Sequence, residues 1–150
     1  MTVSEATKKI EYYCAYQERC HKEVVEKLVS YGMFSDAREH IIAHLIQENY
    51  LNEERFAKSF ARGKFKIKKW GKNRIVQELK HRNISKYNIQ IALKEISEKE
   101  YLRTLDSIAK KRWLEIKESH PLKKKKKLVS YLMYRGWESH LIYEKIGELR

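Results

Sequence analysis

Three segments of the chain share one pattern, and this repeat restricts the possible folds more than any other feature of the sequence. The segments VVEKLVSYGMF, IVQELKHRNIS and LVSYLMYRGWE begin at residues 24, 75 and 128 and align without gaps. Each has a leucine at its fifth position and a Gly or Asn four residues later, namely Gly32, Asn83 and Gly136. Because Gly and Asn enter the left-handed backbone conformation at the lowest cost, we expect each of them to end a helix.

The spacing of apolar residues is helical along the whole chain. Two of the apolar stripes are Val24, Val25, Leu28 and Val29, and Ile41, Ile42, Leu45 and Ile46. No segment shows the sustained alternation of apolar and polar residues that is typical of a strand. With one proline and five glycines, the chain also has few residues for turns. The sequence therefore predicts an all-α protein.

The repeat extends beyond the helix ends and predicts a tandem array. The offsets of 51 and 53 residues that relate the three leucines also relate Leu45, Ile96 and Leu149. We expect an elongated, curved array of three-helix repeats, because such units bury their cores against their neighbours. The predicted repeats are 1–66, which includes an N-terminal helix, 67–119, and a third repeat shortened to two helices at 120–150. Asn52 is expected to cap one helix, and Pro121 to lie in the first turn of another.

The net charge of +13 comes from the middle of the chain. Residues 62–127 contain 22 Lys or Arg and seven Asp or Glu, whereas residues 1–61 contain eight and ten, and residues 128–150 contain three of each. Such an uneven distribution favours a polyanionic partner, since each cation placed on a phosphate releases condensed counterions. The alternative is that basic helices only keep the protein soluble.

Two basic segments are the candidate contact sites for a polyanion. The first contains Arg62, Lys64, Lys66, Lys68, Lys69, Lys72 and Arg74. The second contains Lys123, Lys124, Lys125, Lys126 and Lys127, where five lysines at a helix start oppose the helix dipole and repel one another. Phosphates or the acidic surface of a protein would both suit these cations, and the second segment is also compatible with plainly solvated lysines.

Aromatic residues lie among the first group of cations. Phe65 and Trp70 would stack on nucleic-acid bases if they were exposed. The alternative, which we favour, is that both rings are core residues while the lysine side chains extend outward.

The remaining features point away from catalysis. His40, His44 and Glu48 share a helix face, but without further ligands at zinc-site spacing they predict no metal site. Phosphate-binding loops and the common catalytic motifs are missing from the sequence, so we predict a binding protein without cofactors rather than an enzyme.

Cys14 and Cys20 fit free thiols in a reducing compartment. With no apolar run of membrane-spanning length and no signal peptide, the expectation is a cytoplasmic monomer without membrane contact.

Residues 45–93 resemble the most characteristic block of the RecX family, the regulators of the RecA recombinase. In that block the family pattern Gly-Tyr-Leu-Asp-Asp-x-x-Phe-Ala is followed by a basic segment and then by Gly-x-x-Arg-Ile-x-x-Glu-Leu. The matching stretches here are NYLNEERFA, at residues 49–57, and GKNRIVQEL, at residues 71–79. Residues 18–32 are similar to the first-repeat helix of the family, with Lys22 at the position of a family serine, and Asn49 replaces the family glycine.

The resemblance implies a particular function. RecX proteins are all-helical tandem repeats that lie along the RecA–single-stranded DNA filament and restrain its ATPase, strand-exchange and coprotease activities in recombination and the SOS response. The twelve cations of the two basic segments would then contact the RecA filament or its DNA, single-stranded or double-stranded. The alternative is a general nucleic-acid-binding helical module without a protein partner.

Overall fold

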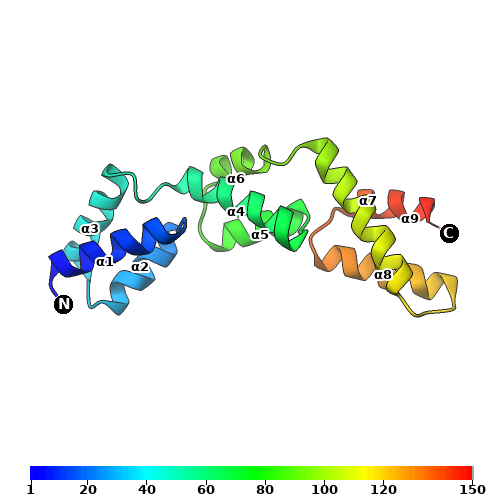
Figure 1. The fold of residues 1–150 in the computed structure, drawn as a ribbon, viewed down its shortest axis with the longest axis horizontal. Coiled ribbons are helices and arrows are strands. Elements are labelled where there is room, and N and C mark those ends of the chain that lie inside the picture. Colours follow the sequence, from blue (N-terminus) through cyan, green and yellow to red (C-terminus); the bar gives the residue numbers. More distant parts are fainter. Residues whose placement is uncertain (150) are drawn as a thin grey trace. The chain divides into compact units, whose positions relative to one another are not determined.

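The computed structural model describes residues 1–149 and is built from α-helices (Figure 1). Within this range the helices are α1 (Val3–Tyr16), α2 (His21–Ser30), α3 (Ser35–Gln47), α4 (Glu53–Lys68), α5 (Lys72–His81), α6 (Lys86–Leu93), α7 (Glu98–Glu115), α8 (Pro121–Tyr134) and α9 (Ser139–Glu148). Residues 1–149 contain no strand, so the all-α prediction is confirmed. No helix in the described part of the chain is both long and apolar enough to cross a membrane.

The three repeated segments end α2, α5 and α8 in the same way. Gly32, Asn83 and Gly136 have φ angles of +80°, +60° and +92°. In each segment the next residue donates its backbone N–H to the repeated leucine: Met33 to Leu28 (2.9 Å), Ile84 to Leu79 (3.1 Å) and Trp137 to Leu132 (3.1 Å). A bond of this span across a left-handed residue defines the Schellman motif, so the predicted helix ends are confirmed.

The same motif fixes the local core. The repeated leucines Leu28, Leu79 and Leu132 are all completely buried. The residues after the left-handed positions, Met33, Ile84 and Trp137, are buried as well. Each helix end therefore orders the backbone and also places an apolar side chain beneath the helix that has just ended, as Schellman motifs often do.

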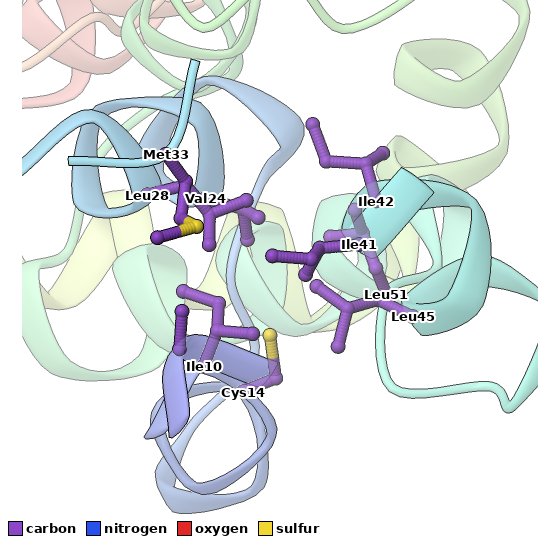
Figure 2. Close-up of a cluster of buried hydrophobic side chains, with 10 residues drawn as sticks. Ile10, Cys14, Val24, Leu28, Met33, Ile41, Ile42, Leu45 and Leu51 are labelled. Carbon is purple, nitrogen blue, oxygen red and sulfur yellow. The ribbon is translucent and has the colours of Figure 1, made fainter. Parts of the chain in front are cut away.

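The chain forms two compact units, of which the first contains Met1–Phe60 and Leu79–Ile91. Its main core lies where α1, α2 and α3 pack against one another. Figure 2 shows Ile10 and Cys14 of α1, Val24 of α2 and Ile41 of α3 pointing toward a common centre. Asn52 caps α4 as expected, since its side-chain oxygen accepts the Arg55 N–H at 2.9 Å.

Two residues assigned to apolar stripes lie outside this core. Val29 is 38% exposed and Ile46 is 54% exposed. Each directly follows a completely buried leucine, Leu28 or Leu45. One residue along an α-helix is a rotation of about 100°, which turns these two side chains away from the core face. The buried stripe is therefore narrower than the sequence suggested.

The second unit contains Ala61–Glu78 and the described chain from Ala92 onward. Within it, α8 packs against both α7 and α9. Tyr101 of α7 lies at its centre, with its ring stacked on Trp137 at 4.4 Å between centroids and tilted against Phe65 at 5.8 Å. The Tyr101 hydroxyl donates to Glu138 and accepts the Lys72 N–H at 2.8 Å. Burial and the bond to Glu138 raise the pKa of Tyr101, so its hydroxyl keeps the donated proton.

Two glycines let backbone segments of this unit touch. The Gly71 N–H donates to the Arg135 carbonyl at 2.8 Å, and the Asn73 N–H donates to the Gly136 carbonyl at 2.9 Å. A Cβ added to Gly71 would collide with the backbone of Gly136, and one added to Gly136 would collide with the backbone of Arg74. The contact therefore requires glycine at both positions, and it holds the start of α5 against the end of α8.

Candidate polyanion-binding surfaces

The first basic segment spans the end of α4, the turn after it and the start of α5, and it presents exposed lysines. α4 ends at Lys68, and Lys69 takes up a left-handed conformation with φ of +59°. The carbonyl of Lys68 accepts the Arg135 Nη1–H at 3.0 Å, and the carbonyl of Lys69 accepts the Trp137 Nε1–H at 3.1 Å. While the backbone is fixed by these bonds, the side chains of Lys66, Lys68 and Lys69 are exposed. Cations at this position also suit the negative end of the α4 dipole.

Three other cations of the first segment make contacts inside the second unit. Arg62 Nη1 lies 2.6 Å from Glu95 Oε1, and Lys72 Nζ lies 3.7 Å from Glu98 and 4.5 Å from the centre of the Tyr101 ring. The Arg74 guanidinium donates to the Tyr134 carbonyl at 3.3 Å and stacks on the Trp70 ring at 4.3 Å. The structure thus divides the segment into exposed lysines and cations that already have partners within the protein.

The two aromatic residues of the segment differ in exposure. Phe65 is 2% exposed and packs on Tyr101, so its ring faces leave no room for a base. The structure supports the alternative in which Phe65 is a core residue. Trp70 is half-buried, with Arg74 on its ring and Lys64 Nζ 5.1 Å from the ring centre. Base stacking by Trp70 stays a prediction.

The second basic segment forms the first two turns of α8, with Pro121 at the helix start as expected. Lys124 Nζ lies 4.2 Å from the Trp113 ring centre, and Lys127 pairs with Glu118 at 3.5 Å. The His120 N–H, which donates to Glu118, and then Lys127 lower the pKa of that carboxyl group. Lys123 and Lys126 are exposed. In this segment Lys124 and Lys127 therefore contact other side chains of the chain, whereas Lys123 and Lys126 extend into solvent.

α7 also contributes to this surface, which the sequence alone did not predict. One groove of about 650 Å³ along α7 and α8 is lined by the cations Arg112, Lys117, Lys126 and Lys127, by Tyr131, and by one carboxylate, Glu115, which pairs with Arg112 at 3.5 Å. The Arg112 guanidinium stacks on Tyr131 at 4.6 Å, and its Nε is buried without a hydrogen-bond partner in the part of the chain that the structure describes. Arg112 lies nine residues before Pro121, outside the run of lysines. Its place beside them depends on the packing of α7 against α8, which the sequence does not show.

His44, Cys14 and Cys20 all contact or pack against other parts of the first unit. His44 of α3 lies 2.7 Å from Glu11 of α1, and within residues 1–149 no three His, Cys, Asp or Glu side chains lie close enough together to hold a metal ion. Cys14 and Cys20 are free and buried. Burial raises the pKa of the Cys14 thiol to about 11 and also raises that of Cys20. Both thiols are therefore protonated and poorly nucleophilic near neutral pH.

Comparison with known families explains this helical array. The model of the second three-helix domain of RecX matches residues 52–93, and the model of the third three-helix domain matches residues 98–146. The chain belongs to the RecX family. The matched segments correspond to α4–α6 and α7–α9. The boundaries drawn from the sequence, after residues 66 and 119, are offset from these domains by one helix.

Curated relatives and solved structures carry the same family name. The chain is 33% identical to the regulatory protein RecX of Lactobacillus gasseri over 90 residues, which are 60% of this chain and 33% of that protein. It is 35% identical to RecX of Yersinia enterocolitica over 99 residues (66% and 58%), and 26% identical to RecX of Clostridioides difficile over 135 residues (90% and 63%). The chain therefore spans between a third and just under two thirds of these relatives.

The structural similarity covers nearly the whole chain. The crystal structure of RecX from Lactobacillus salivarius matches with a TM-score of 0.82 and 26% identity over 98% of this chain and 96% of that one. A second crystal structure, of a regulatory protein RecX, matches with a TM-score of 0.86 and 21% identity over 98% and 73%, and supports the fold. The predicted family and the predicted helical repeat fold are both confirmed.

Proposed function

We propose that this chain binds the RecA–single-stranded DNA filament and inhibits its ATPase, strand-exchange and coprotease activities. The observation that supports this proposal is the exposure of Lys66, Lys68 and Lys69, at the end of α4 and in the turn after it, on a protein of the RecX family. The side chains of Arg135 and Trp137 donate to the carbonyls of Lys68 and Lys69, so the backbone there loses little conformational entropy on binding beyond that of the lysine side chains.

The mechanism that we propose is bridging. The turn after α4 and the lysines of α8 would each contact a DNA phosphate or an acidic side chain of RecA, and a regulator that touches two neighbouring protomers would resist their movements during ATP hydrolysis. Cations suit either type of contact, because phosphates and carboxylates both accept charge-assisted hydrogen bonds. The chain would act in the cytoplasm as a monomer and without a cofactor.

The experiment that tests this function is the single-strand-dependent ATPase of RecA from the same organism, at fixed salt, with increasing amounts of the chain. We expect strong inhibition well below one copy per RecA protomer. A variant with Lys66, Lys68 and Lys69 changed to Glu should lose most of the inhibition. The matched control changes the exposed Lys86, Lys94 and Lys99 to Glu, which alters the net charge equally, and it should still inhibit.

Two results would contradict the proposal. If the chain leaves RecA ATPase unchanged at every ratio, it does not act on the filament. If it inhibits only when it saturates the DNA, and added DNA restores the activity, the chain competes for phosphates. The second result would favour the alternative of a nucleic-acid-binding module without a protein partner.

A further inference from the structure

The first unit contains an aromatic surface for which the proposed function gives no role. Tyr12 and Tyr16 lie one turn apart on α1, and each is 72% exposed. Their ring centroids are 6.5 Å apart and the rings are tilted by 32°. Tyr13 and Tyr31 lie beside them, partly buried against the core of the unit, and together the four rings line a groove of about 530 Å³. We call this groove the tyrosine groove.

Cations supply the rest of the tyrosine groove. Arg19 stacks on Tyr13 with its Cζ 3.8 Å from the ring centre, and Lys27 Nζ lies 5.3 Å from the same ring. Lys8 and Lys9 line the groove from α1. No carboxylate of the described chain is among the lining residues, although residues 1–61 carry a net charge of −2. Four of the eight cations of this acidic segment therefore lie together on one surface, where one of them, Arg19, also pairs with Glu23 at 3.9 Å.

The exposure of Tyr12 and Tyr16 and the cations around them indicate a role in binding rather than in stability. Tyr13 and Tyr31 contribute to the core, but Tyr12 and Tyr16 leave most of their surface in water and add little to stability. An adjacent pair of exposed rings surrounded by cations offers flat stacking faces together with positive charge. That combination is the one by which proteins hold single-stranded nucleic acid, in which bases stack on aromatic rings and phosphates meet cations.

We propose that the tyrosine groove binds a segment of single-stranded nucleic acid. Bases stack on Tyr12 and Tyr16, and neighbouring phosphates contact Lys8, Lys9 and Lys27. The two rings lie 6.5 Å apart between centroids and both are exposed, so neighbouring bases of one strand can stack on neighbouring rings. The site lies on the first unit and needs no RecA, so it is independent of the proposed filament contacts of α4 and α8.

The test measures binding of fluorescein-labelled dT20 by anisotropy without RecA. Changing Tyr12 and Tyr16 together to Ala should weaken binding by about 5- to 150-fold for each stacked base that is lost. Changing both to Phe keeps the rings and should preserve the affinity. Tyr87→Ala is the matched control, because Tyr87 is also exposed, at 71%, and belongs to the same unit, and it should bind like the unchanged chain.

A second arm leaves the protein unchanged and alters the ligand. An abasic 20-mer has the same phosphates as dT20 but no bases, and we expect it to bind as weakly as dT20 binds to the Tyr12→Ala, Tyr16→Ala variant. An rU20 strand should bind about as tightly as dT20, since neither the rings nor the lysines recognise the sugar. A clear preference for either strand would identify the natural source as DNA or RNA.

Two results would overturn the inference. Equal binding of dT20 and the abasic 20-mer by the unchanged chain would mean that bases do not stack on it. Unchanged dT20 binding by the double alanine variant would exclude the tyrosine groove as the site. If that variant instead lost inhibition of RecA while binding dT20 normally, the groove would be a docking surface for protein. Failure of the RecA ATPase test alone would leave the inference intact.

Discussion

At the scale of single residues, burial decides what a side chain does more than its chemical type. Phe65 and Trp70 are five residues apart in the same basic segment, yet Phe65 is in the core and Trp70 is half-buried under cations. The sequence could identify both as aromatic residues among lysines. It could not show that Phe65 meets Tyr101, which lies 36 residues further along the chain, because that contact depends on how α7 packs.

The buried thiol of Cys14 gives a prediction about pH. Burial raises its pKa from 9.0 to about 11, so the unfolded chain loses this proton at lower pH than the folded chain does. The stabilising effect is complete below pH 9 and is lost as the pH rises through 11. We expect the stability difference between the unchanged chain and Cys14→Ala to shrink by about 2–3 kcal/mol over this range, since one pKa unit is about 1.4 kcal/mol.

Urea denaturation of both proteins at several pH values measures this difference. The comparison with Cys14→Ala removes the effects of lysines and tyrosines that titrate in the same range. A stability difference that stays constant from pH 8.5 to 11 would contradict the prediction. It would mean that the Cys14 thiol titrates in the folded chain as it does in the unfolded one.

At the scale of helices, the repeated helix ends are the part of the fold that the sequence predicted best. A Schellman motif is local: it needs one residue that tolerates positive φ and a leucine four residues earlier, and both are visible in three aligned segments. The position at which each repeat begins was harder to predict, because a periodic sequence shows the length of its repeat but not where a unit starts. The family models begin at α4 and α7, one helix before the boundaries drawn from the sequence.

Two of these helix ends give a matched pair of substitutions. Gly32→Ala adds a methyl group where no atom lies within 4 Å, so its cost is only that of the left-handed conformation, about 1–2 kcal/mol. Gly136→Ala has the same backbone cost, but its methyl group would also collide with the backbone of Arg74. We expect Gly136→Ala to destabilise by clearly more than 2 kcal/mol, because the start of α5 must move.

The measurement is again urea denaturation, with near-equal m-values as the sign that both variants unfold from similar native states. Asn83→Gly completes the set, since glycine tolerates the φ of +60° at that position and should change stability by less than either alanine variant. Equal costs for Gly32→Ala and Gly136→Ala would show that the close contact between Gly136 and the Arg74 backbone can relax.

At the scale of the whole molecule, cations gather in two ways. The first is along the sequence: residues 62–127 carry the excess of cations, which a count of charges shows. The second is in space: cations line the tyrosine groove although its segment, residues 1–61, has a net charge of −2, so a count of charges does not show it. Only the fold brings Lys8 and Lys9 of α1 and Lys27 of α2 together in a groove that no carboxylate of the described residues lines. A count of charges along the chain therefore predicts a polyanionic partner but does not show every surface on which cations gather.

This distinction between total charge and local contacts leads to a prediction about salt. If Lys66, Lys68 and Lys69 touch phosphates, changing them to Ala should lower the slope of log Kd for single-stranded DNA against log salt by about 0.7 for each lost contact. Changing Lys86, Lys94 and Lys99 to Ala lowers the net charge by the same amount at exposed positions outside both basic segments. That control should leave the slope unchanged, since counterions are released only where a cation meets a phosphate. Equal slopes for the two variants would mean that the +13 charge acts as a diffuse field, and the turn after α4 would then have no special role in binding DNA.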